Sequence, residues 1–216
     1  MLPLKPASMD PSAYSNHEEW LSSATHALGA VMAIVGLILL VQAAQTNMGL
    51  FSAWVYGVSL VAMFLSSSSY HLTKAPARRI LLRKIDHIAI YLLIAGSYTP
   101  ILLIAVDTYV ARIGTIIIWF IALAGILFKL ILGHKYPKIS IITYAVMGWM
   151  ALFMIYPIYL ALSDQGFLWL IAGGLCYSAG IPLYLLKSRH FSHALWHLFV
   201  LGGAVCHFVT IYFFVY

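Results

Sequence analysis

Residues 21–43 read LSSATHALGAVMAIVGLILLVQA and contain no Asp, Glu, Lys or Arg. A helix needs about 20 apolar residues to cross the hydrocarbon core of a membrane, so this stretch predicts a membrane-spanning helix. Six more predominantly apolar stretches of about this length follow, separated by short connections: 50–72, 85–105, 110–130, 139–162, 167–186 and 191–216. The pattern predicts an all-α polytopic membrane protein, a bundle of seven transmembrane helices.

The composition excludes a water-soluble globular domain. Of the 216 residues, 63% are hydrophobic and only 8% are charged, and the mean hydropathy is +0.95. A soluble domain carries about 25% charged residues, because its surface has to be compatible with water. We therefore expect an integral membrane protein whose outer surface is covered by lipid.

The basic residues are distributed unevenly over the connections. With seven spans, one face of the membrane receives eleven Lys and Arg residues and the other face receives only Arg112. Lys and Arg are enriched in cytoplasmic loops, so the N-terminus is predicted to be cytoplasmic and the C-terminus outside. The eleven are Lys5, Lys74, Arg78, Arg79, Arg83, Lys84, Lys129, Lys135, Lys138, Lys187 and Arg189.

This topology predicts a short cytoplasmic tail, residues 1–17, and a single seven-helix domain, residues 18–216. The net charge of +6 lies in short loops between apolar spans, which fits contact with anionic lipid headgroups at the basic loop 74–84 and not with nucleic acid. We expect residues 77–84 to lie along the membrane interface. The oligomeric state is left open.

Four polar residues are predicted to share one membrane depth at the cytoplasmic end. His71 ends the second span, Asp86 opens the third, and His193 and His197 open the seventh. Ionisable side chains within spans are costly, so they indicate a functional site by default. Residues four apart share one face of a helix, which lets His193 and His197 bind one ion and places Ser67 beside His71.

Three neutral imidazoles with an open fourth position are typical of a catalytic zinc site. The predicted ligands are His71, His193 and His197. Zinc lowers the pKa of a bound water to about 7, and a nearby carboxylate can then act as general base. Asp86 is the candidate for that role, and Ser67 for orienting the water or an oxyanion.

A purely structural reading competes with this one. With nine histidines in the chain, a pair at a spacing of four residues arises by chance about as often as not. A buried Asp can also be hydrogen-bonded to a neighbouring helix, and Arg83, Lys84 or His87 are the available partners for Asp86. His87 itself is expected to point elsewhere on its helix, and His190 is a possible substitute ligand.

The first span carries a second group of polar residues near its cytoplasmic end. Glu19, Ser22 and His26 fall near one face and could support the metal ligands. The alternative is an ordinary helix start, because the acidic side chains of Glu18 and Glu19 stabilise a helix N-terminus electrostatically.

Several separated motifs, in order, resemble those of the bacterial hemolysin III family. They are Glu18-Glu19 with Thr25-His26, Ser67 with Tyr70-His71, Asp86-His87 with Tyr91, Gly96-Ser97-Tyr98-Thr99-Pro100, Gly174 with Tyr177, and His193-Ala194-Leu195-Trp196-His197. The resemblance runs from about Glu18 to the C-terminus. It extends to the progestin and adiponectin receptors and to the alkaline ceramidases.

The resemblance implies seven helices around a zinc ion near the cytoplasmic side, with ligands at His71, His193 and His197. It implies that Asp86 contacts a zinc-bound water and that Ser67 is the nearby hydroxyl. One departure concerns the first motif, where Ser22 stands in place of the usual Asn.

Two functions fit these observations. The first is a zinc-dependent intramembrane hydrolase of lipid amides, similar to the ceramidases, with membrane lipids as substrate. The second is a non-enzymatic membrane protein in which zinc is structural and which senses or regulates lipid composition or energetics. Pore formation is disfavoured by the short loops. The expected location is the bacterial inner membrane.

Overall fold

The structure, a computed structural model, describes residues 14–132, 136–186 and 191–216. Within these ranges, seven helices or helix combinations are long and apolar enough to cross a membrane, so the predicted all-α, seven-span architecture is confirmed. The helical elements are α1 (Asn16–Ala43), α2 (Asn47–Leu72), α3 (Pro76–Pro100), η1 (Ile101–Val106), α4 (Tyr109–Ile131), α5 (Pro137–Trp149), η2 (Met150–Met154), α6 (Ile155–Ala161), α7 (Asp164–Leu185) and α8 (Ser192–Phe214).

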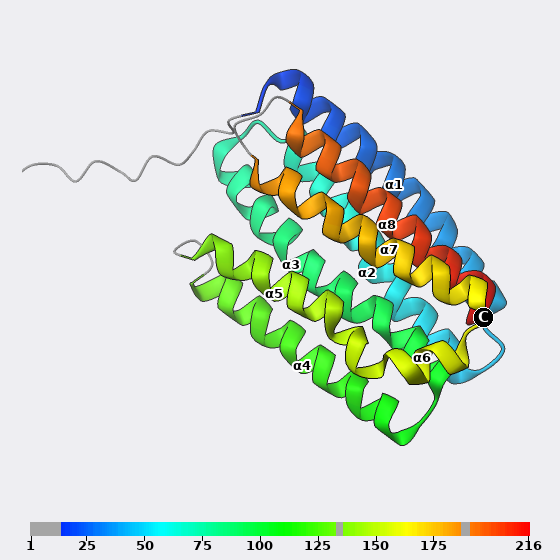
Figure 1. Cartoon of the computed structure of the whole chain (residues 1–216). Helices are drawn as coiled ribbons and strands as arrows, with labels where there is room; N and C mark the ends of the chain where they lie inside the picture. The colour runs from blue at the N-terminus through cyan, green and yellow to red at the C-terminus, as the bar shows by residue number, and fades with distance from the viewer. Residues whose placement is uncertain (1–13, 133–135, 187–190) are drawn as a thin grey trace, which may run out of the picture.

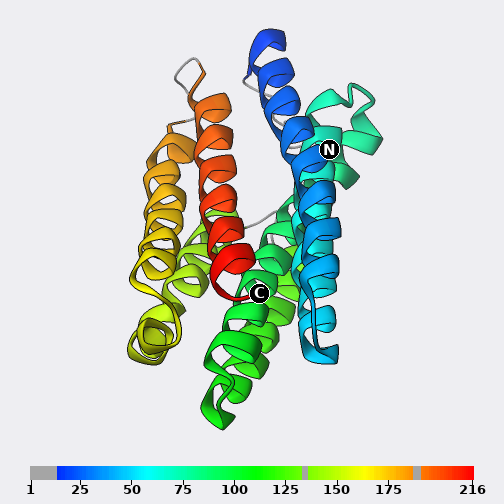
Figure 2. The same ribbon diagram turned by 90° about the vertical axis from the view of Figure 1, so that its right-hand side faces the viewer.

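The helices form one elongated bundle (Figure 1). In that view α1, α8 and α7 run side by side along one edge, while α4 and α5 form the opposite edge with α3 between the two groups. The chain enters the bundle at one end and leaves it at the other, as an odd number of spans requires (Figures 1 and 2). The ends of α2 and α7 and the starts of α3 and α8 therefore meet at the end where α1 begins.

Side-chain caps set several helix starts earlier than hydropathy predicts. Each capping hydroxyl accepts a hydrogen bond from a backbone N–H three residues later, which satisfies a donor that the helix itself leaves unpaired. The caps are Ser15 for Glu18, Thr46 for Gly49, Thr108 for Ala111 and Ser163 for Gly166. As a result α1 begins at Asn16 and not near residue 21.

The basic segment 77–84 is helical, and its position at the membrane interface stays a prediction. It forms the first turns of α3 and continues without a break into the membrane-spanning part. Pro76 stands at the start of α3, where its missing N–H costs nothing, and no helix breaker follows before Pro100. Arg79, in the second turn, forms an ion pair with Glu19 of α1 and so fixes this end of α3 inside the bundle.

Two changes of helix type lie beside prolines within the spans. The chain passes into a π-helix, η1, directly after Pro100, and the 3-10 segment η2 precedes Pro157. At η2 the regular backbone hydrogen bonds that follow α5 are interrupted, and the Tyr98 hydroxyl takes part in their place. It accepts a hydrogen bond from the Ala151 N–H at 2.7 Å and donates one to the Met147 carbonyl at 2.9 Å. By contrast, α7 continues through Pro182.

The outer surface is apolar and the interior contains many polar groups, as expected for a protein solvated by lipid. Phe120 and Phe153 are 72% and 87% exposed, whereas His26, His197 and Ser22 are at most 1% exposed. Buried polar groups in a membrane are costly unless they find partners or serve a function. Most of the ionisable ones lie at the end of the bundle where α1 begins.

Candidate metal centre

Three histidines from two helices converge at this end of the bundle. His71 stands in the last turn of α2, and His193 and His197 stand in the first two turns of α8. The Nε2 atom of His193 lies 3.3 Å from the Nε2 atom of His71 and 3.1 Å from that of His197. All three side chains are buried, and their potential ligand atoms lie within 4.8 Å of one another. The three residues that the sequence singled out can therefore hold one metal ion.

The local structure of α8 holds two of these histidines in register. The spacing of four residues places His193 and His197 on one face, and the side chain of Glu18 accepts a hydrogen bond from the His193 backbone N–H at 3.1 Å. A carboxylate at a helix N-terminus is favoured by the unpaired N–H groups and the helix dipole. Directly before the helix, Phe191 adopts a left-handed conformation (φ 60°), which turns the chain into α8.

Glu19 supports the third histidine. One of its carboxylate oxygens lies 2.6 Å from Nδ1 of His71, and the other pairs with Arg79. Because an ionised carboxylate only accepts hydrogen bonds, His71 carries its proton on Nδ1 and directs the lone pair of Nε2 toward the other two histidines. Metal-binding histidines are commonly oriented by this type of contact.

His26 of α1 lies against the cluster as well. Its ring centroid is 3.8 Å from that of His197, and neither of its ring nitrogens makes a hydrogen bond of good geometry with another described residue. Such a buried imidazole needs a polar partner, and the site offers the space where a metal ion and its remaining ligand would lie. The hydroxyl of Ser22 is likewise buried without a described partner.

Tyr14 covers the cluster from the end of the bundle, and sequence reasoning did not identify it. Its ring stacks on that of His193 with centroids 4.4 Å apart. Burial raises the pKa of the Tyr14 hydroxyl, so this group stays protonated and remains a hydrogen-bond donor at physiological pH. A single tyrosine before the first span carries no spacing signal that could have revealed this contact.

The two residues predicted to act beside the metal occupy different positions. Asp86 is buried in α3, lines the central cavity described below, and lies within electrostatic range of His71 and His26. Ser67 is buried one turn before His71 and is absent from the described cavity lining. His87 does not point away as expected: its Nδ1 lies 3.4 Å from Asp86 and 2.7 Å from the Arg83 carbonyl, which it contacts as donor.

A cavity of about 260 Å³ reaches the histidine cluster at His193 and His26 and continues into the bundle between α3, α5, α7 and α8; His71 and His197 are not among its lining residues. Along α3 and into the first residue of η1, its lining runs from Arg83 to Ile101, about 27 Å at 1.5 Å per residue, which is close to the thickness of a bilayer core. The wall is mainly apolar. His207 also lines this cavity.

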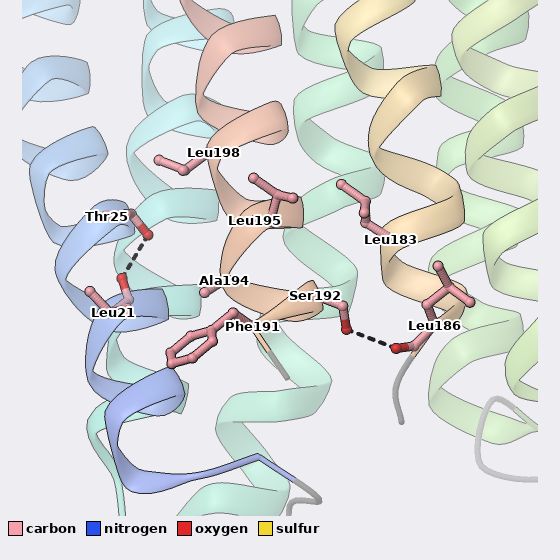
Figure 3. A pocket seen from close by; sticks show the side chains of 9 residues that line it. All are labelled: Leu21, Thr25, Leu183, Leu186, Phe191, Ser192, Ala194, Leu195 and Leu198. Carbon is pink, nitrogen blue, oxygen red and sulfur yellow. Dashed lines mark hydrogen bonds between the residues drawn. The ribbon is translucent and has the colours of Figure 1, made fainter. Parts of the chain in front are cut away.

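A second hollow lies on the outer side of α8 and is unrelated to the cluster (Figure 3). It is a groove of about 420 Å³ lined almost entirely by apolar side chains from α1, α7 and α8, such as Leu21, Leu183 and Leu198. Its hydroxyls are satisfied locally, since Thr25 donates to the Leu21 carbonyl and Ser192 to the Leu186 carbonyl. The groove offers no metal ligand or acid–base group.

The site therefore combines a possible metal-binding group, a buried carboxylate and an apolar cavity. Three imidazoles suit several divalent transition metals, including zinc, copper, iron and nickel. His190, considered above as a substitute ligand, lies outside the described residues, as do most of the tail 1–17 and the basic residues Lys135, Lys187 and Arg189.

Comparison with known proteins agrees with this architecture. Residues 14–208 match the family model described as haemolysin-III related. The chain is 40% identical to hemolysin-3 of Bacillus cereus over 201 residues, which cover 92% of each chain. It is 38% identical to the hemolysin-3 homolog of Bacillus subtilis (91% of this chain, 94% of the relative), and 30% identical to the human monocyte to macrophage differentiation factor (89% and 82%).

Proposed function

The chain belongs to the haemolysin-III related family, and on that premise we propose that it is a zinc-dependent intramembrane hydrolase of lipid amides. The observation that carries the proposal is a group of three buried histidines, one of which, His193, lines a long apolar cavity that is also lined by the carboxylate residue Asp86. The apolar wall of this cavity suits part of an acyl chain, whose polar linkage would then lie beside His193.

The separations between the histidine nitrogens support zinc. Bonds of about 2.0–2.1 Å at tetrahedral angles place two nitrogen ligands about 3.3–3.4 Å apart. The two closest Nε2 pairs, His193 with His71 and His193 with His197, are 3.3 and 3.1 Å apart. Three protein ligands leave a fourth position open, which is typical of catalytic and not of structural zinc.

Each polar group then has a defined task. Zinc, when bound, would polarise the amide carbonyl and activate water. Asp86 takes the proton of the attacking water, whose oxygen bonds to the amide carbon, and returns it to the nitrogen as the carbon–nitrogen bond breaks. Ser67 supplies a hydroxyl beside His71, and Glu19 keeps the His71 ring in the binding tautomer. The apolar wall excludes bulk water and holds the acyl chain.

We also propose that the protein resides in the bacterial inner membrane with its histidine end facing the cytoplasm. The support is the concentration of Lys and Arg in the connections at that end.

Metal analysis of detergent-purified protein tests the zinc part of the proposal. We expect about one zinc per chain in the wild type and its loss in His71→Ala, His193→Ala and His197→Ala. His17→Ala, which removes an exposed histidine at the same end of the bundle, is the matched control and should keep the metal. A folded wild-type protein without metal would contradict the hydrolase proposal. Hydrolysis of N-acyl lipids by the zinc-loaded protein would support it.

A structural or regulatory role for zinc is the second candidate, and the anchoring contacts of α1 favour it. Glu18 connects α1 to α8 by a hydrogen bond, and Glu19 connects α1 to α2 through His71 and to α3 through Arg79. The predicted ligands come from two helices, α2 and α8, so a bound ion would join these two directly and release folding free energy. Under this reading Asp86→Asn leaves every function intact, whereas His197→Ala unfolds the bundle.

A further inference from the structure

Arg83 differs from the other described basic residues at the histidine end because it lines the central cavity. Arg79 is paired with Glu19, and Arg78 and Lys84, which are exposed as Arg83 is, do not contribute to the cavity wall. Among the described residues, Arg83 takes part in no ion pair, although Asp86 follows it by one helical turn. The cavity mouth thus contains one guanidinium without a described counter-charge.

Three tyrosines, Tyr14, Tyr70 and Tyr184, line the same cavity as this guanidinium. The ring centroids of Tyr14 and Tyr184 lie 4.4 and 6.1 Å from that of His193, and the Tyr70 ring lies 4.6 Å from that of His71 and packs against Arg79. Arg83 lies within electrostatic range of Tyr70 and Tyr184, as Asp86 does, and Tyr14 lies within range of Glu18 and Glu19. Together Arg83, Tyr14, Tyr70 and Tyr184 form a cluster, here called the mouth cluster, in which hydroxyl and guanidinium donors come from four separate segments of the chain.

We propose that the mouth cluster binds an oxyanion of the lipid, so that the preferred substrate is an N-acyl amine whose amine portion carries a carboxylate or a phosphate. Arg presents a planar set of donors that matches both groups, and its hydrogen bonds to an anion are stronger than those between neutral groups. This inference rests on the proposed function, because it names the substrate class of the same site.

The geometry also sets how far the anion lies from the amide. Arg83 and Asp86 are three residues apart on α3, so they lie on one face and about 4.5 Å apart along the helix axis. An anion held by Arg83 therefore lies only a few bonds from an amide beside Asp86 and the histidines. The carboxylate of Asp86 repels an anion that enters deeper, which keeps the charged group at the mouth and the acyl chain inside.

Binding to the zinc-loaded protein in detergent tests the proposal. Trp196 and Trp149 line the cavity, so a change in the intensity or wavelength of tryptophan emission reports on occupancy. The probes are N-oleoylglycine, N-oleoyl-O-phosphoethanolamine and the neutral N-oleoylethanolamine, which share one acyl chain. We expect the wild type to bind at least one acidic probe about tenfold more tightly than the neutral one, and Arg83→Gln to remove that preference.

Arg78→Gln is the matched control, since it removes one exposed positive charge from the same helix without touching the cavity. Arg78→Gln should keep the preference for acidic probes. Arg83→Lys, which retains the positive charge, should keep part of that preference, and it provides a second test if Arg83→Gln does not fold. Equal losses in Arg78→Gln and Arg83→Gln, or a wild type that binds all three probes alike, would overturn the mouth cluster as an anion site. The relative tightness of the two acidic probes distinguishes carboxylate from phosphate.

Hydrolysis of the same probes separates this inference from the proposed function. If no probe is cleaved but acidic probes bind in an Arg83-dependent way, the anion site stands and the hydrolase fails. If the neutral and acidic probes are cleaved equally and Arg83→Gln does not change their ratio, the hydrolase stands and the anion site fails.

Discussion

His71 and Glu19 are 52 residues apart in the chain, yet Nδ1 of His71 lies 2.6 Å from a carboxylate oxygen of Glu19. Arg79 holds the other oxygen, so three helices meet in one hydrogen-bonded chain that ends at the histidine cluster. Because this chain fixes the tautomer of His71, it determines whether the third imidazole can present a lone pair to a metal.

Glu19→Gln should weaken zinc binding without removing it. The amide can still accept from Nδ1, but it loses the charge that makes the imidazole a better ligand. The expected change is a 10- to 100-fold loss of affinity, measured by competition with a chromogenic chelator. Asp164→Asn removes an acidic residue from the first turn of α7 and should leave the affinity unchanged. An unaltered affinity in Glu19→Gln would show that the contact serves only packing.

Asp86→Asn distinguishes the two candidate functions. If Asp86 transfers the proton, the variant keeps about one zinc per chain and its hydrolysis of N-acyl lipids falls by roughly 10²- to 10⁴-fold. The measurement pairs elemental analysis with product quantification on the same preparation. A fully active Asp86→Asn protein with normal zinc content would remove Asp86 from the mechanism and favour a structural metal.

The sequence was sufficient to predict the seven spans and the proximity of the three histidines, because the spans and this proximity both follow from local patterns of residues. Seven apolar runs place the ends of α2 and α8 at one membrane face, and the interval between His193 and His197 places them on one helix face. The contacts of Glu19 and His26 depend instead on the rotation of α1 about its axis. Packing against α2 and α8 sets that rotation, and hydropathy does not encode it.

The prolines in the sequence indicate where a helix is irregular, but they do not indicate which type of irregularity forms. Pro100 signals a distortion, yet whether the chain forms a π-helix or a kink depends on how α4 and α6 accommodate the freed carbonyls. The position of the start of α3 likewise involves a distant residue, because Arg79 pairs with Glu19 of α1.

Gly125→Ala should destabilise the bundle. Gly125 of α4 packs against the buried ring of Tyr91, and an added methyl group would overlap that ring, which has no room to move. Overpacking of this kind costs about 1–3 kcal/mol of unfolding free energy. Gly114→Ala lies in the same helix with its nearest neighbouring atom at 3.7 Å, so it should be neutral or slightly stabilising. Thermal unfolding in detergent compares the two, and equal stabilities would contradict the packing argument.

Tyr98→Phe should also lower stability, through the break between α5 and α6. The variant leaves the Ala151 N–H, which now donates to the Tyr98 hydroxyl at 2.7 Å, without a partner. A fully buried unsatisfied donor costs about 1–3 kcal/mol, and since the Ala151 N–H is partly buried we expect a loss of about 1 kcal/mol in the free energy of unfolding. Tyr109→Phe removes a hydroxyl from a side chain that is 79% exposed and should have no effect in the same denaturation assay.

Gly174→Leu tests whether the acyl chain occupies the central cavity. Gly174 lines the cavity, and a Cβ atom built on it meets no atom within 4 Å, so the larger side chain fills the cavity without forcing the helices apart. We expect the variant to keep its zinc but to bind N-oleoylglycine much more weakly than the wild type, while N-butanoylglycine binds as before. Gly174→Ala occupies little of the volume and should retain binding of the long chain. Undiminished binding of N-oleoylglycine by Gly174→Leu would place the acyl chain elsewhere, because a chain inside this cavity has to displace the new side chain.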